Sequence, residues 1–131
     1  PSLIHKFYIA KENKVDVDIW GSGKPLREFI FSRDVAKLTE LLYDNYTEGI
    51  PVILSSSEEI SIKDVVLLIA EIFDFKGNIK FDLSKPEGQF RKPSDNSHIR
   101  SMFSNFKFTP IEDGLKESIE WFVNNYPNLR K

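Results

Sequence analysis

The stretch Val15-Asp-Val-Asp-Ile-Trp-Gly-Ser-Gly-Lys-Pro-Leu-Arg-Glu-Phe-Ile-Phe31 decides the predicted fold. Its first five residues alternate between β-branched and acidic side chains, which is typical of a strand with one buried face. Trp20 shares the parity of the acidic residues and is therefore expected outside the core. Gly21–Pro25 reads as a turn, and Arg27–Phe31 reads as a second strand. We expect the two strands to form a hairpin or to lie next to each other.

The rest of the chain alternates helical and extended patterns around this stretch, and the helical patterns at 61–76 and 109–126 each have an apolar stripe along one face. Polar residues that favour helix starts precede three of the helices: Ser32, Ser61 and Thr109, the last with Glu112 completing a capping box. The expected helices cover residues 2–12, 32–42, 61–76, 96–102 and 109–126, and further strands are expected at 51–54 and 78–82. The pattern predicts an α/β fold with short strands and three to four principal helices.

Composition excludes several classes of protein. The chain has 131 residues, 40% of them hydrophobic, which fits one domain with its own core, residues 1–131. It has no cysteine, which excludes disulfides, thiolate zinc sites and a cysteine nucleophile. A net charge of −2 argues against nucleic acid or an anionic membrane as partner. With no membrane span and no secretory pattern, we expect a cytoplasmic protein. Pro1 in place of an initiator Met leads us to expect a chain cut from a longer one.

Familiar catalytic patterns are missing from the sequence. It contains no G-x-G-x-x-G turn and no Tyr-x-x-x-Lys pair, and Gly21–Lys24 lacks the spacing of a P-loop. His5 and His98 lie far apart and do not have metal-ligand spacing. We therefore predict no catalytic, cofactor-binding or metal-binding residue in this chain.

The remaining chemistry indicates a surface that binds an anion. Lys24 and Arg27 flank the first turn, Arg91 and Lys92 lie in a long polar loop, and Trp20 lies beside them by parity. Arginine can bind a diphosphate through two parallel hydrogen bonds, and an exposed aromatic ring can pack on a base or sugar. Two plainer interpretations stay open: the cations can be ordinary solvated surface, and Trp20 can cap the edge of the core.

A family resemblance adds detail to this reading. The segments 19–30, 32–36, 61–64, 73–77, 81–92, 106–110 and 121–122 together resemble GDP-L-fucose synthase, an extended short-chain dehydrogenase/reductase. The resemblance covers essentially the whole chain and corresponds to the family's C-terminal, substrate-binding lobe without the NADP-binding Rossmann domain. It implies an oxidoreductase and isomerase that converts GDP-4-keto-6-deoxy-D-mannose to GDP-L-fucose with NADPH.

The resemblance also implies the substrate-binding residues. The positions that contact the GDP-sugar in this family match Lys6, Trp20, Arg27, Glu87 and Lys92. Glu87 stands where many members have Asp, and Lys6 where some bacterial members have Arg. The family's catalytic and NADPH-binding groups match no residue here, so the chain alone is expected to be inactive. A homodimer is expected for the whole enzyme and a monomer for this chain.

Two other functions remain open at this point. The chain could be the corresponding lobe of another nucleotide-sugar epimerase or dehydratase, although the stretch Lys85–Lys92 favours GDP-L-fucose synthase. It could also be a non-catalytic interaction module without a cofactor domain.

Overall fold

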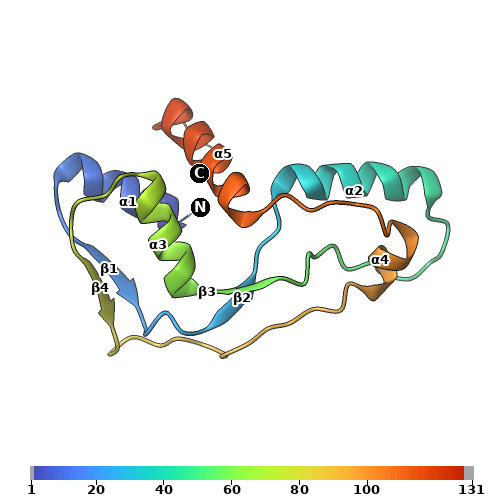
Figure 1. Cartoon of the computed structure of the whole chain (residues 1–131), viewed down its shortest axis with the longest axis horizontal. Coiled ribbons are helices and arrows are strands. Elements are labelled where there is room, and N and C mark those ends of the chain that lie inside the picture. The colour runs from blue at the N-terminus through green and yellow to red at the C-terminus, as the bar shows by residue number, and fades with distance from the viewer. Residues whose placement is uncertain (1, 129–131) are drawn as a thin grey trace.

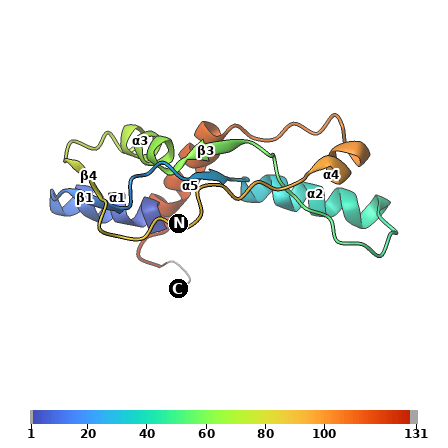
Figure 2. The same cartoon turned by 90° about the horizontal axis from the view of Figure 1, so that it is seen from below.

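The computed structural model describes residues 2–128 and shows an elongated α/β molecule (Figures 1 and 2). Within these residues there are five helices, each of which overlaps a helix that the sequence predicts, and four short strands. In chain order they are α1 (Ser2–Asn13), β1 (Val17–Trp20), β2 (Leu26–Glu28), α2 (Ser32–Asn45), β3 (Glu59–Ser61), α3 (Ile62–Ile72), β4 (Ile79–Asp82), α4 (Ser97–Met102) and α5 (Ile111–Asn125). No helix within residues 2–128 combines the length and the apolar character that crossing a membrane requires.

The strands form two separate two-stranded sheets. β1 pairs in parallel with β4, with Val17 opposite Ile79 and Trp20 opposite Asp82. β2 pairs antiparallel with β3. The predicted hairpin between the first two strands is therefore wrong. Gly21 turns the chain out of β1 with a φ of +78°, and its N–H continues the bonding to β4 by donating to the Asp82 carbonyl at 2.9 Å.

The main hydrophobic core lies where α1, α3 and α5 pack beside β1 (Figure 1). The predicted alternation is confirmed within β1, because Val17 and Ile19 are buried while Trp20 is exposed. It is wrong for Val15, which lies before the strand and is 52% exposed. Apolar residues of three helices complete the cluster: Ile4, Phe7 and Ala10 from α1; Val65, Val66 and Ile69 from α3, with Phe73 just beyond it; Ile119 and Phe122 from α5. The predicted apolar stripes of α3 and α5 therefore supply much of this core.

Two predicted helix starts differ from the structure. The N-cap of α2 is Phe31 rather than Ser32, and the N-cap of α5 is Pro110 rather than Thr109; neither has a side-chain capping bond. Thr109 bonds elsewhere: its backbone N–H and its hydroxyl both donate to the carboxylate of Asp34, at 2.7 and 3.0 Å. Asp34 is buried in α2, so this contact joins α2 to the segment that leads into α5.

The remaining predictions divide between confirmed and wrong. Ser61 caps α3 as predicted, because its hydroxyl accepts a hydrogen bond from the Asp64 N–H at 3.0 Å. The helix ends at Ile72, before the predicted Lys76–Gly77, because Asp74 adopts a φ of +48° and closes a Schellman motif. The predicted strand at 51–54 is wrong, since the next strand begins only at Glu59. The strand at β4 and the short helix α4 are confirmed.

A polar contact also locks β1 to β4. The Asp16 carboxylate accepts hydrogen bonds from the backbone and side-chain nitrogens of Asn78, both at 3.0 Å, and pairs with Lys80 at 2.8 Å. Lys80, followed by Asn78, lowers the pKa of Asp16 from its ordinary 3.8 to about 2. The folded chain therefore holds Asp16 ionised where the unfolded chain begins to protonate it.

Replacing Asp34 with Ala should destabilise the chain by about 1–3 kcal/mol, because the partly buried N–H and hydroxyl of Thr109 lose their acceptor. Urea denaturation followed by circular dichroism measures the loss. Asp44→Ala, at an exposed position of the same helix, is the matched control and should change little. Equal effects of the two variants would contradict this role of Asp34.

The contribution of Asp16 should depend on pH in a defined direction. Because its folded pKa is depressed, the stabilisation is complete above pH 3.8 and disappears as the pH falls through about 2. The difference in unfolding free energy between the unsubstituted chain and Asp16→Asn, measured from pH 5 to 2, should therefore shrink on acidification. A difference that stays constant over this range would contradict the assignment.

Candidate functional site

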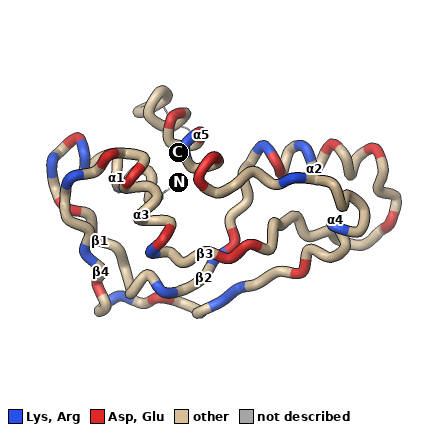
Figure 3. Tube along the Cα trace, viewed as in Figure 1, with Lys and Arg blue, Asp and Glu red and all other residues tan. Residues whose placement is uncertain are grey.

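The candidate site lies at the carboxyl ends of β1 and β4. Trp20 and Asp82 are register partners at the ends of two parallel strands, so the chain leaves both strands at the same edge. The loops that follow, residues 21–25 and 83–96, consequently start side by side. In α/β proteins this edge is where ligands usually bind. Figure 3 shows basic positions, with acidic ones between them, along the loop that passes below β2.

Trp20 presents its indole ring to solvent. Its exposed fraction is 63%, so it does not cap the core. The Asp82 carboxylate accepts hydrogen bonds from the backbone N–H and the hydroxyl of Ser84, at 3.0 and 2.6 Å, which tightens the turn after β4. This turn brings Lys85 back over the indole, with its ammonium nitrogen 5.8 Å from the ring centre. No local sequence signal marks Lys85 as a neighbour of Trp20, because their contact depends on the strand pairing.

Glu87 links the two loops. Its carboxylate accepts a hydrogen bond from the backbone N–H of Ser22. Hydrogen bonding from Ser22 is the largest cause that lowers the pKa of Glu87, and Lys24 adds a smaller electrostatic contribution. Glu87 also lies against Gly21, where an added Cβ would come within 2.5 Å of the Glu87 Cγ. The site therefore holds an ionised carboxylate next to Trp20.

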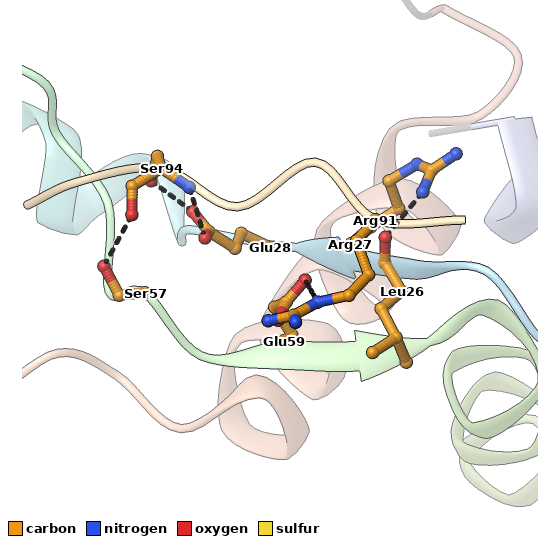
Figure 4. Close-up of polar contacts among 7 residues, drawn as sticks. All are labelled: Leu26, Arg27, Glu28, Ser57, Glu59, Arg91 and Ser94. Atoms are coloured by element: carbon orange, nitrogen blue, oxygen red, sulfur yellow. Dashed lines mark hydrogen bonds and ion pairs between the residues drawn. The ribbon is translucent and has the colours of Figure 1, made fainter. Parts of the chain in front are cut away.

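The two arginines of this region have different environments (Figure 4). Arg27, on β2, is half-buried, and its guanidinium donates to the Leu26 carbonyl at 2.5 Å. Arg91, in the loop after β4, forms an ion pair with Glu59 of β3 through two of its nitrogens. Glu59 raises the pKa of Arg91 above its already high ordinary value. The structure thus commits Arg91 to Glu59, in contrast to the expectation that it joins Lys92 in binding an anion.

Lys92 and Lys6 are both exposed. Lys92 lies in the loop that runs along β2, between Phe90, whose carbonyl accepts from the Leu26 N–H at 2.8 Å, and Ser94. Lys6 is on α1, and its ammonium group donates to the Asp18 carbonyl of β1 at 2.6 Å. The structure therefore places the Lys6 contact two residues from Trp20 in β1.

Other polar side chains and cavities lie outside this region. His5 packs between the rings of Phe122 and Tyr126, and His98 lies beside Tyr46 and Glu48. Two cavities within residues 2–128 have volumes of about 240 and 270 Å³. One is lined by residues of β3 and the start of α5, and the other by Leu41 and residues 102–106. Neither is lined by any of the five predicted site residues.

Known proteins resemble this chain over its full length. The chain is 48% identical to a GDP-L-fucose synthase from Dictyostelium discoideum, covering 100% of this chain and 42% of the relative. Its structure superposes with a TM-score of 0.97 on a crystal structure of a GDP-L-fucose synthetase from Naegleria fowleri bound to NADP, at 41% identity over 100% of this chain and 41% of that one. This chain is therefore similar to GDP-L-fucose synthases along its whole length.

Two further comparisons show how specific this similarity is. Residues 1–54 match the model of the NAD dependent epimerase/dehydratase family. A GDP-mannoheptose C4 reductase from Campylobacter jejuni, solved with NADP bound, gives a TM-score of 0.77 at 31% identity over 94% of this chain and 44% of that chain. The likeness is thus stronger to the GDP-L-fucose synthases than to this reductase. The chain spans less than half the length of each of these relatives.

The contact between Gly21 and Glu87 can be tested with a pair of glycine variants. Gly21 and Gly88 have φ values of +78° and +75°, so alanine at either position strains the backbone by roughly 1–2 kcal/mol. Only Gly21→Ala also displaces Glu87, because the nearest atom to a Cβ at Gly88 is 3.8 Å away, on Arg27. We expect Gly21→Ala to lose more stability and to release the Ser22 amide to faster hydrogen exchange.

Gly49→Ala serves as the control, because an added Cβ there meets nothing within 4 Å. Equal Ser22 exchange rates in Gly21→Ala and Gly88→Ala would show that Glu87 does not depend on this contact.

Proposed function

We propose that residues 1–131 form the nucleotide-sugar-binding lobe of a GDP-L-fucose synthase. The observation that carries the proposal is the similarity to GDP-L-fucose synthases along the whole chain, at 48% identity. The site geometry supports it, because Trp20 ends β1, while Glu87 and Lys92 lie on the loop that leaves β4 and Glu87 bonds to the loop after β1. The lobe would hold the GDP-sugar so that its hexose ring meets catalytic groups on the rest of the protein.

The five residues would contact different parts of the ligand. Arg27 and Lys92 would neutralise the diphosphate, for which a guanidinium and a mobile ammonium group are suited. Trp20 would form a wall of the pocket. The Glu87 carboxylate, already held by Ser22, would accept a hydrogen bond from a sugar hydroxyl with its remaining lone pairs. Lys6 keeps two N–H donors beyond its bond to Asp18 and would use them on the ligand.

The chain's own residues do not fit NADPH. Gly21 and Gly23 follow a strand, as dinucleotide-binding glycines do, but they lead into β2 instead of a helix N-terminus. The dinucleotide site needs that helix end for its pyrophosphate. We therefore assign NADPH binding, and with it ketone reduction and epimerisation, to a part of the protein outside this chain.

Two alternatives make different predictions. A lobe of another nucleotide-sugar enzyme would prefer a different base or a different sugar. The TM-score of 0.77 to the GDP-mannoheptose C4 reductase, below the 0.97 to a GDP-L-fucose synthetase, favours GDP-L-fucose synthase over that reductase. A non-catalytic module would lack a cofactor domain. Upstream coding sequence separates these cases, since a G-x-x-G-x-x-G turn and a Tyr-x-x-x-Lys pair ahead of Pro1 would support the enzyme.

GDP should bind the 131-residue chain weakly and change the fluorescence of Trp20. Trp121 is also exposed, on α5, so Trp121→Phe leaves Trp20 as the only tryptophan. In this background, GDP should alter the emission with a saturable dose dependence, and UDP should do so at higher concentration. Arg27→Ala or Lys92→Ala should each weaken binding about ten-fold or more, because each removes a charge-assisted contact.

Lys107→Ala, at an exposed position in the segment before α5, is the matched control for loss of one positive charge. Circular dichroism verifies that each variant is folded. The proposed function would be contradicted by saturating GDP that leaves Trp20 emission unchanged, or by an equal loss of affinity in Lys107→Ala.

A further inference from the structure

We propose that Glu28 is a positioning residue, which holds the loop after β4 against β2 so that Lys92 faces the diphosphate. This inference rests on the proposed function and deepens it by naming what organises the site. Nothing in the family resemblance assigns Glu28 a contact with the ligand. The case for it comes from the bonds that fasten residues 90–96 to the β2–β3 sheet (Figure 4).

The loop needs such a fastening because it has little hydrophobic anchoring. Residues 83–93 are all exposed, including Leu83 at 74% and Phe90 at 61%. A segment with few buried apolar contacts opens easily unless polar contacts hold it. The position of Lys92 is therefore set by hydrogen bonds and ion pairs on both sides of it.

Glu28 supplies the contact after Lys92. Its carboxylate accepts the Ser94 backbone N–H at 2.8 Å and also the Ser94 hydroxyl. Before Lys92, the carbonyl of Phe90 accepts the Leu26 N–H, and Arg91 pairs with Glu59. Lys92 and Pro93 therefore lie between two positions that polar contacts hold in place, Phe90–Arg91 before them and Ser94 after them. Proline adds stiffness to this short span because its ring restricts φ.

The same carboxylate joins a second loop to the first. Glu28 accepts the hydroxyl of Ser55, a residue with an exposed fraction of only 6%. The Ser55 hydroxyl in turn accepts the Ser57 N–H at 2.9 Å, and the Ser55 carbonyl accepts the side-chain amide of Asn96 at 2.8 Å. Glu28 is consequently the centre of a hydrogen-bond network. The two loop segments that bond to it, around Ser55 and around Ser94, are also bonded to each other.

The network also explains the charge state of Glu28. Burial acts to raise the pKa of its carboxyl group, but the hydrogen bonds from Ser55 and Ser94 outweigh burial and lower the pKa below its ordinary 4.5. Glu28 is therefore an ionised acceptor at neutral pH, and bonds to an ionised acceptor are stronger than neutral ones. Glutamine has the same shape but lacks this charge, which makes Glu28→Gln the informative variant.

A double-mutant cycle with GDP as the probe tests whether Glu28 acts through Lys92. The cycle uses the unsubstituted chain, Glu28→Gln, Lys92→Ala and the double variant, with GDP affinity measured by NMR titration. Glu28→Gln alone should weaken GDP binding by about five- to ten-fold, and the double variant should bind about as weakly as Lys92→Ala. In Glu28→Gln the Ser94 amide should also exchange faster before GDP is added.

The control is Glu58→Gln, which removes the same charge from an exposed residue next to β3 and should leave GDP affinity unchanged. If Glu28→Gln fails to fold, Ser94→Ala replaces it in the cycle, since it removes only the hydroxyl bond. Affinity losses that multiply fully in the double variant, or an unchanged affinity in the Glu28 variant, would overturn the proposal. If the unsubstituted chain binds no GDP, the proposed function itself is overturned. GDP binding to that chain is therefore measured before any variant is tested.

Discussion

The parallel pairing of β1 with β4 is the constraint on which the candidate site depends. Parallel strands leave a sheet at the same edge, so the residues after Trp20 and those after Asp82 begin as neighbours although they are 62 positions apart. The hydrogen bond from the Gly21 N–H to the Asp82 carbonyl continues this pairing into the first loop. The contacts between Glu87 and Ser22, and between Lys85 and Trp20, both follow from it. If β1 had instead paired with β2 in an antiparallel hairpin, the loop after β1 would not need to begin beside the loop after β4.

Apolar burial fixes the frame, whereas polar contacts fix the loops. The packing of α1, α3 and α5 around β1 holds the strand ends in place. Residues 83–93 gain little from that core and depend on the Leu26 amide, Glu28 and Glu59. This division is common where a rigid scaffold presents binding residues on loops. It also means that a variant at Glu28 can affect the loop with less effect on the core.

The sequence predicted features that depend on local chemistry, and failed where distant partners decide. The exposure of Trp20, the Ser61 cap and the apolar stripe of α5 each follow from neighbouring residues, and all three are confirmed. The strand pairing was predicted wrongly because an alternating pattern shows which face of β1 is buried and does not identify its partner. Thr109 is a good N-cap by type, but the distant Asp34 binds its hydroxyl. The Glu59 partner of Arg91 is likewise 32 residues away, with no local signal.

The positions of the charged groups then define the orientation in which the ligand would bind to the proposed site. Arg91 is neutralised by Glu59, so the cations assigned to the diphosphate are Arg27 and Lys92. Glu87 is ionised, and an ionised carboxylate close to a diphosphate would repel it. On the proposed function, the phosphates must therefore lie toward Lys92 and a hydroxyl-bearing part of the ligand toward Glu87 and Trp20. A ligand bound in the reverse direction would place its phosphates against Glu87 and leave Lys92 without an anion. The same loop that binds the GDP-sugar would thus also select its orientation, which a surface of cations alone could not do.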